Sequence, residues 1–439
     1  MNKKTENKAV SPWQWVPSLY FAQGIPYVVV MSVAVILFKR MGMSNTDIAL
    51  YTSGLNLPWV IKPLWSPLVD LLKTKRWWIV VMQILVGAGL AGIALTIQGP
   101  LAFRYCLAFM WLLAFSSATH DIAADGFYML GLNEKKQAYF VGIRNTFYRF
   151  AVIFGQGILV MFAGWLEQRY AREMPETAAI PQAWSLTFYL LTILFALLFV
   201  YHYLFLPHPR RDTCTLPPQQ ASAGRVFKEF LGTFTSFFQK KHIVSALIFI
   251  LLYRFAEAQL VKITSPFLLD TPATGGLALS TAEVGFIYGT IGVIALTIGG
   301  IVGGIAMARR GLKSCLWTIA MNLPNIVYLY LSFARPESIG IISGCVAIEQ
   351  FGYGFGFTSL TYFMMLFSNG KHQTAHYAIC TGFMALGLML PGMISGWIEE
   401  SIGYRAFFVW IMLCTIPSFW ATHLVRKNLT DNHSDNSSR

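Results

Sequence analysis

Charged residues are scarce in this sequence. Asp, Glu, Lys and Arg make up 12% of its 439 residues, whereas 55% are hydrophobic and 15% are aromatic. A soluble domain carries about 25% charged residues, and apolar stretches long enough to cross a bilayer recur along the whole chain. The composition therefore predicts an integral membrane protein and excludes a large soluble catalytic domain.

The sequence also lacks the features of a metal-binding or secreted protein. Its six cysteines lie mostly inside apolar runs and show no paired metal-ligand spacing. They are Cys106, Cys214, Cys315, Cys345, Cys380 and Cys414. The start MNKKTENK resembles a leader, but the apolar run after it is too long and has no small-residue cleavage site. We expect free thiols, no cofactor and an uncleaved first span.

Basic residues are in excess, with a formal net charge of +13. They fall in short clusters between apolar runs and form no continuous basic stripe, so we expect no nucleic-acid partner. If the N-terminus is cytoplasmic, Lys and Arg on that side outnumber those on the other by about three to one. The pattern predicts that both termini are cytoplasmic.

Twelve spans follow from apolar runs of about 20 residues. The first six are predicted at 14–38, 46–70, 77–98, 103–128, 138–165 and 184–206. The second six are predicted at 242–269, 281–308, 313–334, 338–367, 373–399 and 404–425. We therefore predict an all-α membrane fold in which the six spans before the linker and the six after it form two repeated halves.

The predicted domains are an N-terminal bundle over 1–206, a cytoplasmic linker over 207–241 and a C-terminal bundle over 242–427. The linker begins Pro-rich and then places Phe and Leu at helical spacing, which predicts an amphipathic helix at the membrane surface. The polar tail 428–439 is predicted to be disordered.

Spans four and five carry buried charges of both signs. At about 1.5 Å per residue, Asp121 and Arg149 lie at one depth, and Asp125 and Arg144 lie at a shallower one. Adjacent antiparallel helices could form both pairs. These are either structural ion pairs or groups that change partner during transport, with a proton replacing an Arg on its carboxylate.

Span seven contains Arg254 and Glu257 on one helix face, with Lys262 a turn and a half further along. Span ten contains Glu349, which has no basic residue nearby in its own span. Arg254 and Glu257 could form a purely structural pair. Glu349 could be a carboxyl that is neutral in one state or a hydrogen-bonded structural residue.

Polar groups in the first two spans complete the set. Lys62 lies in a span interrupted by prolines, where it could bind substrate anions or extend its ammonium toward the interface. In span one, Tyr20 and Gln23 mark a polar stretch near mid-membrane.

One enzyme motif also matches. His120 and Asp125 form the H-x-x-x-x-D pattern of glycerolipid acyltransferases, in which the His is a general base. It lies within an apolar span and no phosphate-binding block follows. We expect no enzymatic activity, and keep a membrane acyltransferase as the competing class.

Several segments carry a family resemblance. KPLWSPLVD at 62–70 is similar to K-x-L-W-S-P-x-x-D, and ATHDIAADGF at 118–127 is similar to A-x-Q-D-I-x-x-D-x-W. LLYRFAEA at 251–258 and EQFGYGFG at 349–356 match two later motifs in order, and Tyr148-Arg149 matches a Tyr-Arg pair. The chain thus resembles the peptide/acetyl-CoA/drug branch of the major facilitator superfamily, and within it the AmpG-type muropeptide permeases.

The resemblance implies two six-helix bundles, alternating access and proton-driven uptake of anhydro-muropeptides. His120 and Phe127 depart from the family's Gln and Trp, which leaves an oligosaccharide or acyl-CoA carrier as the alternative. We expect a monomeric, proton-coupled importer of an anionic, sugar-containing solute in the bacterial inner membrane.

Roles follow for the candidate residues. Arg149, Lys62, Arg254 and Arg144 are expected to bind the substrate, with Tyr20, Gln23 and Tyr253 lining the cavity. Asp121, Glu257, Glu349 and Asp125 are the candidates for proton coupling.

Overall fold

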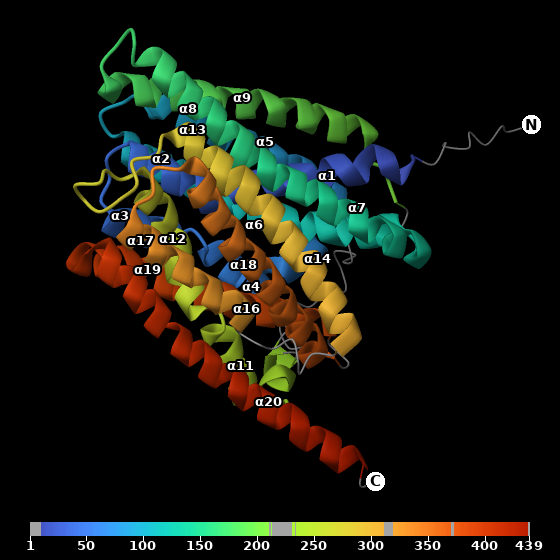
Figure 1. The fold of residues 1–439 in the computed structure, drawn as a ribbon. Helices are drawn as coiled ribbons and strands as arrows, with labels where there is room; N and C mark the ends of the chain where they lie inside the picture. Colours follow the sequence, from blue (N-terminus) through green and yellow to red (C-terminus); the bar gives the residue numbers. More distant parts are fainter. Residues whose placement is uncertain are drawn as a thin grey trace, which may run out of the picture. The chain divides into compact units, whose positions relative to one another are not determined.

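The computed structural model describes residues 10–209, 212, 231–232, 234–310, 319–369 and 373–437. Every regular element within these residues is helical (Figure 1). This agrees with the predicted all-α class.

The first half of the chain forms long helices joined by short turns. In order they are α1 (Pro12–Val28), α2 (Ala34–Arg40), α3 (Asn45–Gly54), α4 (Leu57–Leu72), α5 (Lys75–Thr96), α6 (Ala102–Gly131), α7 (Glu134–Val152), α8 (Leu159–Tyr170) and α9 (Glu176–Phe205). Short π-helical segments, Val29–Val33 and Ile153–Ile158, join α1 to α2 and α7 to α8.

The second half is built in the same way. Its helices are α11 (Ile243–Leu252), α12 (Phe255–Leu269), α13 (Thr281–Val284), α14 (Val293–Arg310), α16 (Ile319–Asn322), α17 (Ile326–Ala334), α18 (Ile339–Ser368), α19 (Gln373–Leu413) and α20 (Thr415–Ser437). A π-helical segment, Gly285–Gly292, joins α13 to α14, and a 3₁₀ turn, Leu323–Asn325, joins α16 to α17.

Eight helical stretches in the described residues are long and apolar enough to cross a membrane. They are Pro12–Arg40, Lys75–Thr96, Ala102–Gly131, Ile143–Tyr170, Glu176–Phe205, Ile243–Leu269, Thr281–Met307 and His376–Arg426. The last stretch covers two predicted spans, which meet at Gly403, where φ is +75°. The three remaining predicted spans also coincide with helices: 46–70 with α3 and α4, 313–334 with α16 and α17, and 338–367 with α18.

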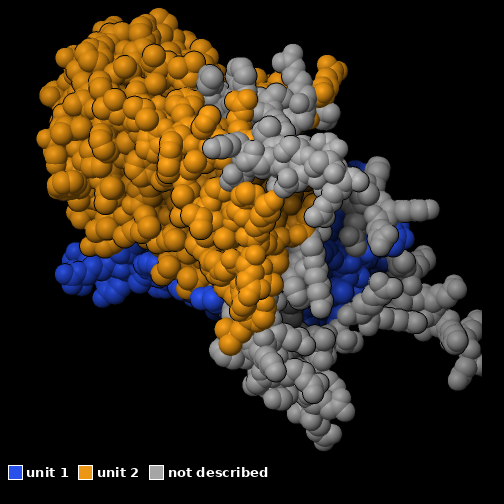
Figure 2. Space-filling model, turned by 90° about the horizontal axis from the view of Figure 1, so that it is seen from below, with its two compact units in different colours: residues 1–28, 64–154, 184–220 blue, residues 29–63, 155–183, 221–439 orange. Residues whose placement is uncertain are grey.

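The chain divides into two compact units, coloured separately in Figure 2. Unit 1 contains residues 1–28, 64–154 and 184–220, and unit 2 contains residues 29–63, 155–183 and 221–439. The division passes through α4 and α9. The predicted division of the sequence into two six-helix halves stays a prediction.

Unit 1 is held together by close helix packing. Helix α1 packs on α6 and α7, and α5 packs on α6. Its apolar core includes Trp15 and Phe127, whose ring centroids lie 5.2 Å apart. A Cβ at Gly24 would lie 2.6 Å from the Ala151 Cβ, so only glycine lets α1 approach α7 this closely.

Unit 2 combines segments from both halves of the sequence. Helix α3 packs on α19, α12 packs on α19, α2 and α3, and α8 packs on α13. A Cβ at Gly396 would collide with the carbonyl of Asn45, which fixes how closely α19 meets α3. An apolar cluster that includes Phe237, Phe249 and Phe363 forms a second core.

The linker and tail were less predictable. Residues 213–230, which contain most of the Pro-rich part of the linker and the start of the predicted amphipathic helix, lie outside the described residues. Residues 234–238 are helical, with Phe237 fully buried. The tail predicted to be disordered instead continues α20 to Ser437. Extending a helix that an apolar span has already nucleated costs little free energy. Polar composition alone therefore did not predict where α20 ends.

Candidate functional site

The Asp125–Arg144 pair predicted from helix depth is present in unit 1. Arg144 Nη1 lies 3.3 Å from Asp125 Oδ1. Tyr20 joins the pair, because its hydroxyl accepts a 2.9 Å hydrogen bond from Arg144 and donates a 3.1 Å bond to Asp125. The guanidinium also lies over the Tyr20 and Tyr128 rings, at 4.8 and 5.1 Å. Three helices, α1, α6 and α7, therefore meet at one charged cluster.

The deeper pair, between Asp121 and Arg149, is not formed in the part of the chain that the structure describes. Arg149 is half-buried on α7 and follows Tyr148, whose ring centroid lies 6.4 Å from that of Tyr27. Gln23 on α1 is buried, and its Oε1 has no hydrogen-bond partner among the described residues.

Unit 1 also contains a buried polar chain that was not predicted. Gln83 Nε2 lies 3.2 Å from His120 Nε2 and 2.8 Å from His202 Nδ1. His202 Nε2 lies 3.0 Å from Ser18 Oγ. Gln83, His120 and His202 are at most 2% exposed. Polar residues inside apolar runs were the available signal, but nothing in the sequence indicates which of them lie side by side.

The Arg254–Glu257 pair is formed in unit 2, at the break between α11 and α12. Arg254 Nε donates a 2.9 Å hydrogen bond to Glu257, and its terminal nitrogen donates another to the Tyr353 hydroxyl. Tyr253, predicted to line a cavity, is fully buried in the apolar cluster and donates to the Gly356 carbonyl. Its aromatic ring prefers the core, and in this structure it joins α18 to the α11–α12 break.

Glu349 on α18 is 3% exposed and is held by neutral groups. Its Oε2 accepts hydrogen bonds from the Tyr328 hydroxyl at 3.2 Å and from Gln350 Nε2 at 2.9 Å. No ion pair to Glu349 occurs among the described residues. Glu257 is near enough for the two carboxyls to repel each other when both are charged. Lys62, the remaining candidate, lies partly exposed on α4.

A polar network at one end of unit 2 joins segments from the two halves of the sequence. Lys39 Nζ lies 2.7 Å from Asp270 Oδ1, and the Tyr404 hydroxyl donates a 2.5 Å bond to the same carboxylate. Asn45 Nδ2 donates to Glu399 at 2.7 Å. These contacts join α2 and α3 to the ends of α12 and α19. They were not predicted, because no local pattern pairs residues more than 200 positions apart.

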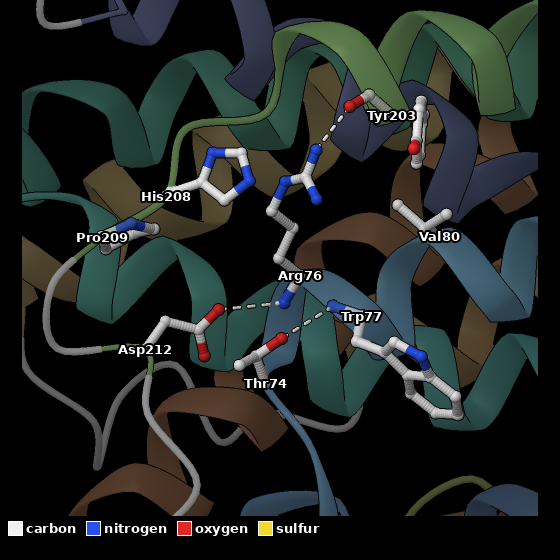
Figure 3. Close-up of a pocket in the computed structure, with 8 residues that line it drawn as sticks. All are labelled: Thr74, Arg76, Trp77, Val80, Tyr203, His208, Pro209 and Asp212. Atoms are coloured by element: carbon white, nitrogen blue, oxygen red, sulfur yellow. Dashed lines mark hydrogen bonds between the residues drawn. The ribbon is translucent and has the colours of Figure 1, made fainter. Parts of the chain in front are cut away.

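A cavity of about 230 Å³ lies in unit 1 where α5 begins and α9 ends (Figure 3). Asp212 accepts hydrogen bonds from the backbone N–H groups of Lys75 and Arg76, at 2.7 and 3.1 Å. The Arg76 side chain donates to the carbonyls of Tyr203 and Leu206. The segment after α9 thus caps the start of α5, and Arg76 of α5 caps the end of α9. None of the candidate site residues lines this cavity.

The geometry does not support an acyltransferase. His120 contacts Gln83, whereas Asp125 contacts Tyr20 and Arg144, so the described residues contain no His–Asp dyad. Groups of three or more potential metal ligands are likewise absent from the described part of the chain. Buried charges placed on many apolar helices are instead typical of proteins that move a solute across a membrane.

The comparisons with known proteins agree with this class. The model of the Major Facilitator Superfamily matches residues 18–365, and the chain belongs to this superfamily. AmpG 4 of Rickettsia conorii (strain ATCC VR-613 / Malish 7) is 25% identical over 92% of this chain and 93% of that protein. The anhydromuropeptide permease of Escherichia coli (strain K12) is 24% identical over 94% of this chain and 79% of the permease.

Solved structures share the fold at low sequence identity. The nucleoside transporter NupG superposes with a TM-score of 0.68 at 13% identity, covering 94% of this chain and 98% of NupG. A D-xylose–proton symporter gives 0.67 at 13% identity, covering 94% of this chain and 96% of the symporter. The protein is therefore a multi-pass secondary transporter of the bilayer that carries a small molecule. The prediction that it is not an enzyme is confirmed.

Proposed function

We propose that this protein is a proton-coupled importer of anhydro-muropeptides in the bacterial inner membrane. The name of its Escherichia coli relative, which aligns with 94% of this chain, supports the substrate. Glu349 carries the proposal of coupling. A membrane-buried carboxyl bonded only to neutral groups is most stable when protonated, and it can lose that proton only when water reaches it.

The proposed importer works by alternating access between halves 1–206 and 242–427. The packing of α2, α3 and α8 on second-half helices, together with the Lys39–Asp270 network, supports a state that is closed at this end of unit 2. The basic-residue bias supports assigning that end to the periplasm and both termini to the cytoplasm.

The proposed roles follow from the contacts. Arg144, Arg149, Lys62 and Arg254 would bind substrate carboxylates, because a guanidinium or ammonium can exchange one carboxylate for another. Tyr20 and Gln23 would offer hydrogen bonds to the sugar. Asp121 and Asp125, with Glu257 and Glu349, would exchange protons as their partners change.

The test is uptake of a labelled anhydro-muropeptide into vesicles with and without an imposed proton gradient. Accumulation that depends on the gradient supports the proposal. Absence of gradient-dependent muropeptide uptake, together with gradient-dependent uptake of a labelled oligosaccharide or acyl-CoA, would replace the substrate by one of these.

The Glu349→Gln variant tests the coupling residue. Gln keeps the shape and hydrogen bonds of a neutral Glu but cannot release a proton, so gradient-driven uptake should fall to its level without a gradient. Exchange of labelled for unlabelled substrate should continue. Glu283→Gln is the matched control, because Glu283 caps α13 and Gln can also serve in a capping box. Equal loss of uptake and exchange in E349Q would instead show a structural role.

A further inference from the structure

Lys262 on α12 is a buried cation with no partner among the residues that the structure describes. From Ala256 to Leu269 every residue of this helix is buried except Val261, and Lys262 is 3% exposed. Within the described part of the chain, its ammonium makes neither an ion pair nor a hydrogen bond. An unpaired buried charge is strongly unfavourable, so such a group must lose its proton or gain an anion.

The carboxylates on α12, directly after it and on the adjacent α19 have other partners. Glu257, earlier on the same helix, bonds Arg254. Asp270, just beyond the end of α12, bonds Lys39 and Tyr404. Glu399 on α19 accepts from Asn45 of α3. The described residues therefore supply no counter-ion for Lys262 in this state.

The register of α12 and α19 places Lys262 within the closed end of unit 2. The Leu251 carbonyl packs against Gly387 and the Ala258 carbonyl packs against Gly392, so residue numbers rise in the same direction along α11–α12 and along the part of α19 before Gly403. Lys262, four residues beyond Ala258, therefore lies about level with Gly396, four residues beyond Gly392, where α19 meets the Asn45 backbone of α3. Ser53 of α3 also packs at Gly392, and its Oγ has no partner among the described residues.

We propose that Lys262 binds a carboxylate of the transported solute when α3 separates from α12 and α19. Separation would open Lys262 to the side from which the solute arrives, and a free ammonium there attracts an anion. Renewed closure requires that the ammonium be paired or neutral. This inference rests on the proposed import of an anionic solute and adds a specificity residue to it.

The first test measures the exposure of Lys262 without any substrate. Purified protein in proteoliposomes is treated at pH 8 with sulfo-N-hydroxysuccinimide acetate, and acetylation of Lys262 is measured by mass spectrometry. Wild type should be labelled weakly. Gly396→Leu, which places a side chain against the Asn45 carbonyl, should be labelled strongly. Asp270→Asn, which removes the charge that holds Lys39, should open the same end without inserting bulk and serves if G396L does not fold. Labelling of Lys262 as weak in a folded opened variant as in wild type overturns the inference.

The second test uses transport of two muropeptides, one with free carboxylates and one with the carboxylates amidated. Lys262→Met should raise KM for the free acid about tenfold to a hundredfold, the usual effect of losing a hydrogen bond to a charged group. KM for the amide should not change, K262R should retain most of the affinity, and K262M should be at least as thermally stable as wild type.

An equal KM for the free acid in K262M and wild type overturns the inference. Failure of wild type to carry either muropeptide overturns the proposed function instead, and the acetylation result still decides whether Lys262 is exposed on opening.

Discussion

Tyr20 turns the Asp125–Arg144 pair from a contact between two helices into a contact among three. The Asp125 side chain is 41% exposed and the Arg144 side chain 27% exposed, and a pair this accessible contributes little stability by itself. With the Tyr20 hydroxyl bonded to both, α1 joins the contact between α6 and α7. Depth along two adjacent helices predicted the pair, whereas Tyr20 comes from a span more than 100 residues earlier and only tertiary structure brings it there.

The His120–Gln83–His202 chain makes a prediction at the same scale. Both imidazoles can be neutral if the Gln83 amide donates to each of them and His202 donates to Ser18. Gln83→Leu keeps the volume but leaves two buried ring nitrogens without a donor. The variant should lower the free energy of unfolding by about 1–2 kcal/mol, since hydrogen bonds between membrane helices contribute modestly. Thermal unfolding in detergent measures this loss. Thr192→Val, which removes only a hydroxyl bonded within its own helix, is the control; equal melting temperatures for Q83L and wild type would contradict the prediction.

At the scale of helices, the ends of the membrane spans were more predictable than the breaks inside them. Apolar length predicted all twelve spans, because crossing a bilayer sets one length for every helix. The break at Tyr253–Arg254 was not predicted, because no Gly or Pro marks it. The polar contacts of Arg254 with Glu257 and Tyr353 help to stabilise the residues around the break.

The cap formed by Asp212 is testable on α5. Its carboxylate accepts two backbone N–H groups that have no partner within the helix, and removing such a cap typically costs about 1 kcal/mol. Asp212→Ala should therefore speed hydrogen exchange over the first turn of α5, measured by mass spectrometry. Glu173→Ala, at an exposed site, should leave it unchanged. Unaltered exchange in D212A would mean that the contact does not stabilise the helix end.

For the whole molecule, the two compact units differ from the two halves of the sequence. Unit 2 takes residues 29–63 and 155–183 from the first half and packs them with second-half helices. A sequence pattern predicts two repeated halves but describes no particular state of a transport cycle. The contacts that define a closed end join residues from both halves, so they could not be predicted from either half alone.

The Lys39–Asp270–Tyr404 network gives a prediction about that state. Asp270→Asn removes the charge that holds Lys39 and weakens the bond from Tyr404, so the closed end of unit 2 should open more often. Spin labels on cysteines placed at Asp47 and Ser401 would report this by electron–electron double resonance. The four described cysteines are all buried, which limits background labelling there. D270N should shift the distance distribution toward longer values, whereas E173Q, which changes an exposed carboxylate elsewhere in unit 2, should match wild type. If the D270N distribution also matches wild type, the closed end is held by helix packing such as that at Gly396, and the ion pair does not control opening.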